Sequence, residues 1–343
     1  MRGRIPITVI VAATVAMARP ALAGPALLFD ATDRNVLYAE DLDSHWHPAS
    51  LTKIMTAYLT FVAIQDGTLT LETKIGCSKL ANSQGPTKVG LPVGAEITVA
   101  IALQALIMKS ANDVAVMLAE AVSGSHEAFV DYMNGMAGRL GMTRTKFANA
   151  NGLPDPIQVT TARDMAKLAA AVVRDFPQHA YMWSMLQMRV GKRQLHTHNG
   201  LLTNYAGADG MKTGFICDSG FNVVASATRE GHKLVAVVLG EATGQERSVR
   251  AVNLLEHGFR TRRWKSLFGS STLDTLPLDE NAKIAVTKPG RVISAVCGTG
   301  GRAVARVKKK GRGIAGESQA NVRHARSKGR GTAMTRKSPS ASP

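Results

Sequence analysis

The spacing of apolar residues along the chain changes from two residues to about 3.6 and back to two. The alternating stretch ALLFDATDRNVLYAED predicts two short strands joined by a turn at residues 32–35. From Pro48, apolar residues recur at 51, 54, 55, 58, 59 and 62, which predicts a helix ending near Asp66. Residues 68–97 are broken by Gly and Pro, so we expect loops and short strands there.

The helical spacing returns from Thr98 to about Lys109, is interrupted at residues 110–112, and resumes to Ala121. It recurs at residues 125–139. A further helix is expected at 161–174, with Thr160 or Thr161 as its N-cap.

The last part of the pattern alternates again. MKTGFIC, FNVVASAT and KLVAVVLG predict three consecutive strands, with a tight turn at residues 229–232 between the last two. A final helix is expected from about Glu246 to His257. The order of hairpin, helices, three strands and helix predicts an α+β fold, with an antiparallel sheet flanked by helices and a segregated helical region.

The two ends of the chain differ from this core in composition. Arg2 and Arg4 precede an apolar run at residues 5–17, and small residues lie before Gly24, so residues 1–23 are predicted to be a secretory signal. An uncleaved N-terminal anchor is the alternative. We therefore expect an exported protein of the periplasm or cell envelope.

The net charge of +17 is concentrated at the other end. Residues 301–343 hold 12 Lys or Arg and a single acid, Glu317, with few large apolar residues, so we expect a disordered basic tail. Such a tail attracts an anionic envelope or membrane surface, or remains solvated without a partner. Because interleaved aromatic residues are missing and the chain is predicted to be exported, we expect no specific nucleic acid.

Three cysteines, Cys77, Cys217 and Cys297, allow at most one intrachain disulfide. Cys217 is expected to be a buried small hydrophobic residue, with a thiol near a cleft as the alternative. No Cys/His cluster has the spacing of a zinc site, and the His196/His198 pair is interpreted as a surface or cleft feature. We expect neither a metal nor a cofactor.

Candidate chemistry begins with Ser50 and Lys53, which lie three positions apart and therefore on one helix face. A serine needs a base to become a nucleophile, and a lysine among apolar neighbours loses its charge more readily. The N–H groups at a helix N-terminus favour an oxyanion beside Ser50. A capping serine with a solvated lysine is the alternative, because Ser-x-x-Lys arises by chance in chains of this length.

Two further motifs make a chance occurrence of the Ser-x-x-Lys pair a weaker explanation. Ser110-Ala111-Asn112 interrupts a helix, where a hydroxyl and an amide can face a cleft; a helix cap is the alternative. Lys212-Thr213-Gly214 lies on a predicted strand and combines a positive charge, a hydroxyl and a glycine that lets another backbone lie alongside.

Together the motifs, 60 and 102 residues apart, are those of penicillin-binding proteins and class A β-lactamases. Over roughly residues 25–262 the chain resembles the low-molecular-mass penicillin-binding proteins, which are serine-type D-alanyl-D-alanine carboxypeptidases with a β-lactamase/transpeptidase-like fold. The likeness is carried by PASLTKIMT (48–56), KSANDVAV (109–116), ANGL (150–153), ARDMA (162–166), HNGLL (198–202), DGMKTG (209–214) and FNVVASAT (221–228).

The resemblance implies a function and a set of catalytic roles. The protein would remove the terminal D-alanine from peptidoglycan stem peptides ending in D-Ala-D-Ala, and β-lactams would inhibit it covalently. Ser50 would attack the carbonyl between the two D-alanines, Lys53 would take its proton, and Ser110 would pass a proton to the leaving amine. Asn112 would hold the substrate amide.

The resemblance also implies how the substrate carboxylate is bound. Lys212 would set the positive potential, Thr213 would bind the carboxylate, and Arg247 would lie near it. The oxyanion hole would be formed by the N–H of the nucleophilic serine and that of Phe215, the residue after Gly214. Many relatives have histidine at this last position, and arginine where this chain has His198 before Asn-Gly-Leu-Leu, so substrate preference is expected to differ.

The catalytic residues also help to distinguish this function from its alternatives. A class A β-lactamase needs a glutamate base, and the chain has none between Glu127 and Glu230. An endopeptidase that cuts D-alanyl cross-links would use the same residues and stays open. A non-catalytic envelope-binding protein would need neither the nucleophile nor the base. The predicted organisation is a signal peptide (1–23), a peptidase domain (24–262), a short extension with strand-like pieces (263–300) and the basic tail (301–343).

Overall fold

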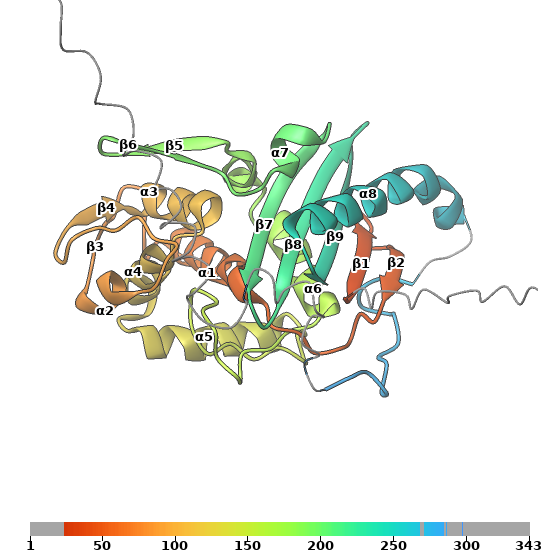
Figure 1. Cartoon of the computed structure of the whole chain (residues 1–343), viewed down its shortest axis with the longest axis horizontal. Coiled ribbons are helices and arrows are strands. Elements are labelled where there is room, and N and C mark those ends of the chain that lie inside the picture. The colour runs from red at the N-terminus through yellow and green to blue at the C-terminus, as the bar shows by residue number, and fades with distance from the viewer. Residues whose placement is uncertain (1–23, 268–270, 285, 287–296, 298–343) are drawn as a thin grey trace, which may run out of the picture. The chain divides into compact units, whose positions relative to one another are not determined.

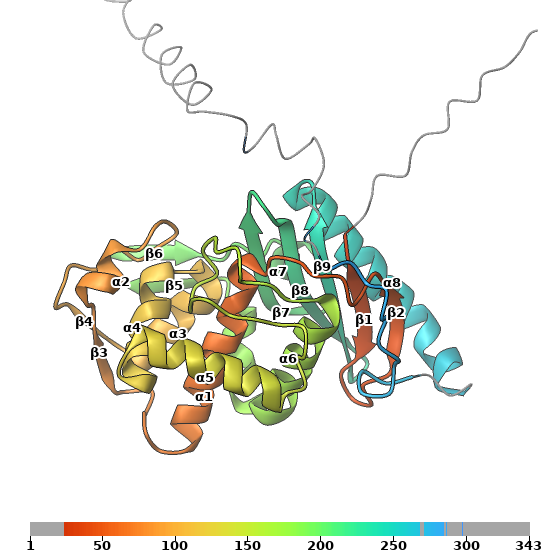
Figure 2. The ribbon, with the colours of Figure 1, turned by 90° about the horizontal axis from the view of Figure 1, so that it is seen from below.

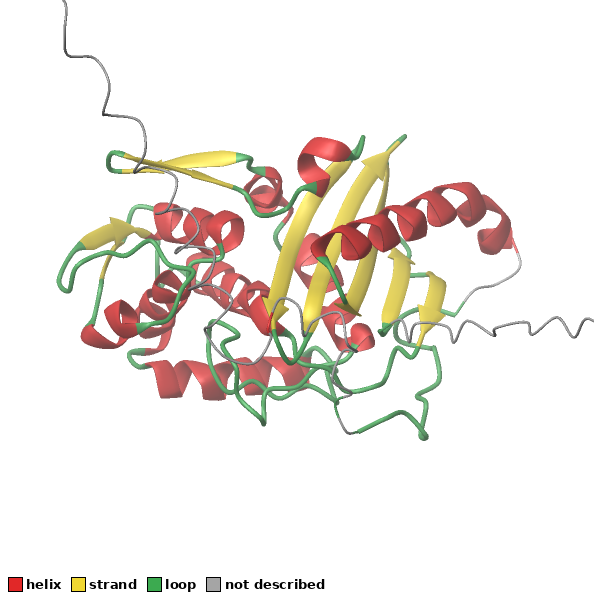
Figure 3. Cartoon of the chain, in the orientation of Figure 1, coloured by secondary structure: helices red, strands yellow, loops and turns green. Residues whose placement is uncertain are grey.

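The computed structural model describes residues 24–267, 271–284, 286 and 297. It shows an antiparallel sheet with helices on both faces, beside a region built mainly of helices (Figures 1 and 3). The predicted α+β class is confirmed. The predicted signal peptide and basic tail lie outside the described residues.

The main sheet has five strands in the order β2-β1-β9-β8-β7, and each neighbouring pair is antiparallel. The strands are β1 (Ala26–Asp30), β2 (Val36–Glu40), β7 (Ala208–Ile216), β8 (Gly220–Arg229) and β9 (His232–Glu241). The predicted N-terminal hairpin and the three consecutive strands are therefore confirmed. Strand β7, which carries Lys-Thr-Gly, is at one end of the strand order, and the hairpin is at the other.

Both faces of the sheet are covered, because successive side chains of a strand point to opposite sides. Val223 packs in the core beneath α8 (Gly244–Leu267), and Val224 packs in the core shared with the other helices, including α6 (Ala162–Asp175) (Figure 2). Helix α8 lies so close to the sheet that a Cβ at Gly258 would be 2.7 Å from side chains of β1 and β9. The predicted final helix exists and extends further in both directions.

The helical region is assembled around α1 (Lys53–Gln65), of which ten residues are buried. Helices α4 (Asn112–Ser123) and α5 (His126–Arg139) were predicted close to these bounds and pack beside it. The short helix α2 (Lys79–Ser83), which the pattern did not predict, precedes the loop that faces α4; β3 (Lys74–Gly76) and β4 (Glu96–Thr98) form a small separate sheet. Among the described helices, none is both long enough and apolar enough to span a membrane.

The interruption predicted at residues 110–112 has a distinct geometry. Helix α3 (Val99–Gln104) continues as a π-helical turn, η2 (Ala105–Lys109), and Ser110 then adopts a left-handed backbone with φ of 60°. The N-cap of α6 is Thr161, whose hydroxyl accepts a hydrogen bond from the N–H of Asp164. This choice resolves the two alternatives that the sequence left open.

Residues 177–204 contain elements that the hydrophobic pattern did not predict. They are a 3-10 segment, η3 (Pro177–Ser184), a hairpin of β5 (Gln187–Val190) and β6 (Arg193–His196), and the short helix α7 (Leu201–Asn204). The hairpin side chains are largely exposed. Strand β5 does alternate, with Met188 and Val190 buried, but over only four residues, and β6 shows no such alternation.

Residues 271–284 pack against the rest of the described chain as a segment of turns and irregular backbone. The buried guanidinium of Arg163 pairs with Asp43 at 2.6 Å and donates hydrogen bonds to the carbonyls of Leu276 and Pro277. The strand-like piece predicted at 282–286 is not a strand in its described residues, and the one at 292–296 lies outside them. The segment is therefore held by hydrogen bonds from the buried Arg163 and by an antiparallel bridge between Asn35 and Thr272.

Candidate active site

Ser50 lies in a 3-10 turn, η1 (Ala49–Thr52), directly before α1. The pattern predicted that Ser50 begins the α-helix, whereas in the structure the helix begins three residues later, at Lys53. The amide of Asn222, on β8, donates to the carbonyls of His47 (3.0 Å) and Pro48 (3.3 Å) and accepts from the N–H of Gly240 (2.9 Å). The sheet thus fixes the chain that enters this turn.

Lys53 is the first residue of α1 and only 1 % exposed. Its Nζ lies 3.1 Å from Ser50 Oγ, 2.7 Å from Asn112 Oδ1, and in contact with the carbonyl oxygen of Asn151. The contact predicted between the serine and lysine head groups is confirmed. When the amine is neutral it has two N–H groups for the two amide oxygens, and its lone pair can accept the serine hydroxyl.

Burial lowers the pKa of Lys53 well below its usual value, and the nearby charge of Lys212 lowers it further. Asp113 acts in the opposite direction. The Asp113 carboxylate accepts hydrogen bonds from the N–H groups of Val89 (3.0 Å) and Gly90 (2.7 Å). The site therefore favours the neutral amine that a general base requires.

Ser110 and Asn112 reach the same place from the break between η2 and α4. The hydroxyl oxygen of Ser110 is buried and has no hydrogen-bond partner within the described part of the chain. Asn112 uses its oxygen for Lys53 and one N–H for the carbonyl of Gly85 at 3.0 Å. The Ser110 hydroxyl therefore takes no part in the hydrogen bonds of the described chain.

Strand β7 brings the third motif against the serine turn. A Cβ at Gly214 would be 3.1 Å from both the carbonyl oxygen of Pro48 and the backbone nitrogen of Ser50. The prediction that this glycine admits a second backbone is confirmed. Lys212 is 2 % exposed; burial lowers its pKa to about 7, with a further contribution from Arg247. Thr213 is half-buried on the same strand.

Two further predicted residues lie beside this strand. Burial lowers the pKa of Arg247 to about 10, and its Nε has no partner among the residues described. Its charge reaches Lys212, so helix α8 contributes to the positive potential of the site. Phe215 packs on Phe221 of β8, with ring centroids 4.3 Å apart. An aromatic pair thus follows the Lys-Thr-Gly motif.

Residues 12–243 match the family model described as D-alanyl-D-alanine carboxypeptidase, peptidase family S11. The chain belongs to this family. D-alanyl-D-alanine carboxypeptidase DacC of Escherichia coli is 36% identical to it over 241 residues, covering 68% of this chain and 60% of the relative. DacA of Haemophilus influenzae is 35% identical over 238 residues, covering 68% and 61%. The matched region thus spans about three fifths of these curated relatives.

Solved structures agree with the family assignment and with the fold. Penicillin-binding protein 5 of Haemophilus influenzae superposes with a TM-score of 0.67 and 35% identity, covering 69% of this chain and 71% of that one. Penicillin-binding protein D2 of Listeria monocytogenes, solved with cefotaxime bound, gives a TM-score of 0.64 at 28% identity, covering 69% and 97%. These likenesses place the S11 fold over the part of the chain that holds all three motifs.

Sequence reasoning gave no role to two positions that shape the S11 site. The carbonyl of Asn151 accepts from Lys53, and the next residue, Gly152, has a positive φ of +80°. A Cβ at Gly152 would lie 1.9 Å from the carbonyl oxygen of Ala49. The stretch ANGL had carried the family resemblance, and an Asn-Gly pair is a turn signal, but only the fold brings it to the lysine.

Asn222 was also assigned no role, although FNVVASAT belonged to the resemblance. Its side chain is fully buried and saturated by backbone partners of the serine turn and β9. A polar residue in an apolar strand was the available signal, because a buried amide must find hydrogen bonds.

His198 Nε2 lies 3.2 Å from Lys109 Nζ, and desolvation together with the charges of Lys109 and Lys212 keeps its pKa below the usual value.

The interpretation of Cys217 as a buried residue is wrong, since it is exposed and forms a disulfide with Cys297. The limit of one disulfide is confirmed, with Cys77 free and buried. The described residues contain no group of three or more His, Cys, Asp or Glu placed to share a metal ion.

Proposed function

We propose that this S11 protein is a serine carboxypeptidase that removes the terminal D-alanine from peptidoglycan stem peptides through an acyl-enzyme on Ser50. The observation that carries the proposal is the buried amine of Lys53, 3.1 Å from Ser50 Oγ, fixed by the oxygens of Asn112 and Asn151. A pure binding protein gains nothing from a desolvated lysine beside a serine, because that burial costs stability.

Acylation would begin with the transfer of the Ser50 hydroxyl proton to neutral Lys53. Oγ then bonds to the carbonyl carbon between the two D-alanines, and the carbonyl oxygen becomes an oxyanion. The N–H groups of Ser50 and Phe215 would receive it. The close approach of Gly214 to the serine turn supports this pairing, since it brings the two backbones together.

The tetrahedral intermediate would collapse by cleavage of the C–N bond, and the leaving D-alanine amine would take up a proton. The Ser110 hydroxyl, buried and without a partner in the described chain, would relay that proton from Lys53. Water would then attack the ester on Ser50, with Lys53 again as base, and release the shortened peptide. Atoms and charge balance with one water consumed.

Recognition of the terminal carboxylate would rest on Thr213, Lys212 and Arg247. A carboxylate bound beside Lys212 would raise the pKa of that lysine from about 7 and hold it as an ammonium. Asn112 would present its amide to the substrate. Lys109 adds a further positive charge beside the site, next to His198, whose imidazole is uncharged at neutral pH because its pKa is lowered to about 4.

β-Lactams would acylate the same serine. A related penicillin-binding protein from Listeria monocytogenes was solved in cefotaxime-bound and ampicillin-bound forms, and its fold covers this site. Because the chain lacks the glutamate that activates a deacylating water in class A β-lactamases, the penicilloyl adduct would be released slowly.

We also propose that the protein works outside the cytoplasm, in the periplasm or cell envelope, where peptidoglycan is found. The apolar, Arg-preceded N-terminus supports export. The basic residues of 301–343 would hold the enzyme near an anionic envelope surface through charge, in a manner that salt weakens.

Labelling with fluorescent penicillin tests the catalytic assignment. The wild-type protein should acquire a covalent label on the peptide containing Ser50, and Ser50→Ala should acquire none. Ser83→Ala, an exposed serine of α2, is the matched control and should label as wild type. Label retained by Ser50→Ala contradicts the proposal.

A second assay separates the peptidase alternatives. The protein should release D-alanine from a peptide ending in D-Ala-D-Ala faster than it cleaves a D-alanyl cross-linked dimer. Cross-link cleavage without D-alanine release would identify an endopeptidase. Penicillin labelling with neither activity would leave a penicillin-binding receptor and contradict the carboxypeptidase assignment.

A further inference from the structure

The loop at residues 148–153 supplies one of the contacts that hold the Lys53 amine, the carbonyl of Asn151. Ala150 and Asn151 are 0 % and 1 % exposed, so their backbone groups depend on partners within the protein. The loop follows Lys53 in the chain by nearly 100 residues. Whatever fixes this loop therefore decides where the amine lies relative to Ser50.

Ala150 is held at both of its backbone polar groups. Its carbonyl accepts a hydrogen bond from Thr56 Oγ1 at 2.6 Å, and Thr56 lies on the same face of α1 as Lys53, three positions later. Its N–H donates to Nε2 of His126 at 3.2 Å. Helix α1 thus holds two consecutive carbonyls of the loop, those of Ala150 and Asn151, while α5 holds the N–H between them and the preceding residue.

His126 can accept this hydrogen bond only as a neutral imidazole with its proton on Nδ1. It is the first residue of α5, where the N-terminus of the helix disfavours a positive charge. Desolvation lowers its pKa, against the carboxylates of Glu127 on α5 and Glu120 on α4, which raise it. A protonated ring would turn a second N–H toward that of Ala150 and break the bond.

We propose that His126 is a positioning residue of the serine site: by accepting the Ala150 N–H, its imidazole fixes the loop whose next carbonyl holds the Lys53 amine. This role rests on the proposed function, since it serves the proton transfer from Ser50. Without the imidazole, the buried N–H of Ala150 has no acceptor and the loop must shift to find one, because buried backbone N–H groups are almost always paired.

The test compares two variants of the full chain by the rate of penicillin acylation. His126→Leu has no acceptor, and its rate should fall about tenfold; this is less than the loss for a 1 Å displacement, about 10²-fold, because Thr56 still holds the loop. His126→Gln places an amide oxygen near the position of Nε2 and should stay within about threefold of wild type. Rescue by glutamine would assign the effect to the acceptor and not to the ring.

The pH dependence supplies a second measurement. Titration of Lys53 affects the wild type and His126→Gln alike, so it cancels in the ratio of their acylation rates. This ratio should be constant above about pH 6.5, the ordinary pKa of histidine, and should fall at lower pH, where His126 is protonated and glutamine is not. His232→Gln replaces a half-buried histidine at the start of β9 and should keep a constant ratio to wild type.

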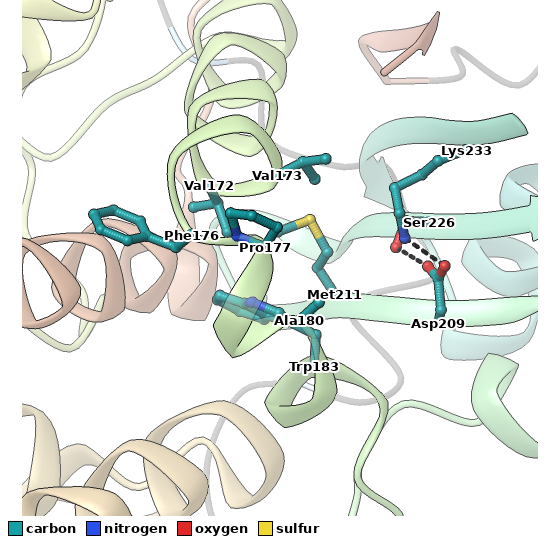
Figure 4. Close-up of a pocket in the computed structure, with 10 residues that line it drawn as sticks. All are labelled: Val172, Val173, Phe176, Pro177, Ala180, Trp183, Asp209, Met211, Ser226 and Lys233. Atoms are coloured by element: carbon teal, nitrogen blue, oxygen red, sulfur yellow. Dashed lines mark hydrogen bonds and ion pairs between the residues drawn. The ribbon is translucent and has the colours of Figure 1, made fainter. Parts of the chain in front are cut away.

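A matched control separates positioning from a general loss of stability. Ser226 lines a cavity of about 100 Å³ between α6, η3 and strands β7–β9, where its Oγ donates to Asp209 at 2.6 Å (Figure 4). Ser226 is 2 % exposed, and neither Lys53 nor any residue of the 148–153 loop lines that cavity. Ser226→Ala also removes one buried hydrogen bond, so it should lower Tm by a similar few degrees but leave acylation within about twofold of wild type.

An imidazole ¹⁵N spectrum tests the hydrogen bond without catalysis. In Ser50→Ala, the His126 signals, assigned with His126→Gln, should show a proton on Nδ1 and none on Nε2 at neutral pH. A proton on Nε2 overturns the proposal. So do acylation by His126→Leu at the wild-type rate, no rescue by glutamine, or a ratio that is constant with pH. Absence of labelling in the wild type contradicts the proposed function, whereas these outcomes contradict only the role of His126.

Discussion

Gly152 provides a sharp test of how the serine and its base are held together. Replacement by alanine would place a Cβ 1.9 Å from the carbonyl oxygen of Ala49 and 3.0 Å from the backbone nitrogen of Ser50. Both neighbours are backbone atoms and cannot rotate away. The serine turn and the loop that carries Asn151 must therefore separate by on the order of 1 Å, given ordinary carbon–oxygen contacts of about 3.3 Å.

The expected loss follows from this displacement. The Asn151 carbonyl and Ser50 Oγ both contact Lys53 Nζ, so separating them breaks the geometry needed for proton transfer. A misplacement of about 1 Å costs on the order of 10²-fold in rate. We expect Gly152→Ala to reduce the second-order rate constant of penicillin acylation by about that factor. The rate is measured from a time course of labelling with fluorescent penicillin, quenched at set times.

Alanine at a positive φ also strains the backbone, at about 1–2 kcal/mol, and this effect needs its own control. Gly67 and Gly124 have φ of +75° and +77°, and a Cβ at either would meet no atom within 4 Å. Gly67→Ala and Gly124→Ala should lower Tm by a few degrees, about 2–4 °C per kcal/mol, and leave acylation within about twofold of wild type. If Gly152→Ala acylates as fast as these controls, the close contact with the serine turn does not position the nucleophile.

Further predictions concern the groups around the site. The folded pKa of Lys212, about 7, lies below its ordinary value, so burial of the ammonium costs stability. This cost is full below the folded pKa and falls as the pH rises from there towards the ordinary value, because the unfolded chain binds more protons in that window. Lys212→Met should therefore raise Tm, more at about pH 6 than at about pH 9, while acylation falls at least about tenfold; a lower Tm at both values would contradict the burial argument. Asn222→Ala leaves the carbonyls of His47 and Pro48 without their buried donor and should cost about 1–3 kcal/mol in urea unfolding, with slower acylation. Unchanged acylation would show that the turn is held without it. Cys297→Ser removes the cross-link to Cys217 across 80 residues and should cost about 2–4 kcal/mol, as reduction of the wild type should; equal unfolding midpoints would show that the bond adds no constraint.

The local elements were largely readable from the sequence, because each has a short-range cause. The helical period around Lys53 and the alternation along residues 208–241 reflect which side chains must leave water, and both predictions agree with the structure. The interruption at Ser110 was also visible, since the apolar period stops there. The hairpin at residues 187–196 was missed because its alternation covers only the four residues of β5 and does not continue in β6.

The chain alone determined the chemical groups of the candidate site: a serine with a lysine three positions later, a serine and asparagine at a helix break, and a lysine, threonine and glycine on a strand. Tertiary structure decided what surrounds them. The carbonyl of Asn151 accepts from Lys53, 98 residues away, and the amide of Asn222 donates to Pro48, 174 residues away. The backbone at Gly152 lies against Ala49, more than 100 residues away. Hydrogen bonds and steric limits of this kind depend on distances in space, which no local period encodes. The same reason explains why the disulfide between Cys217 and Cys297, 80 residues apart, was not predicted.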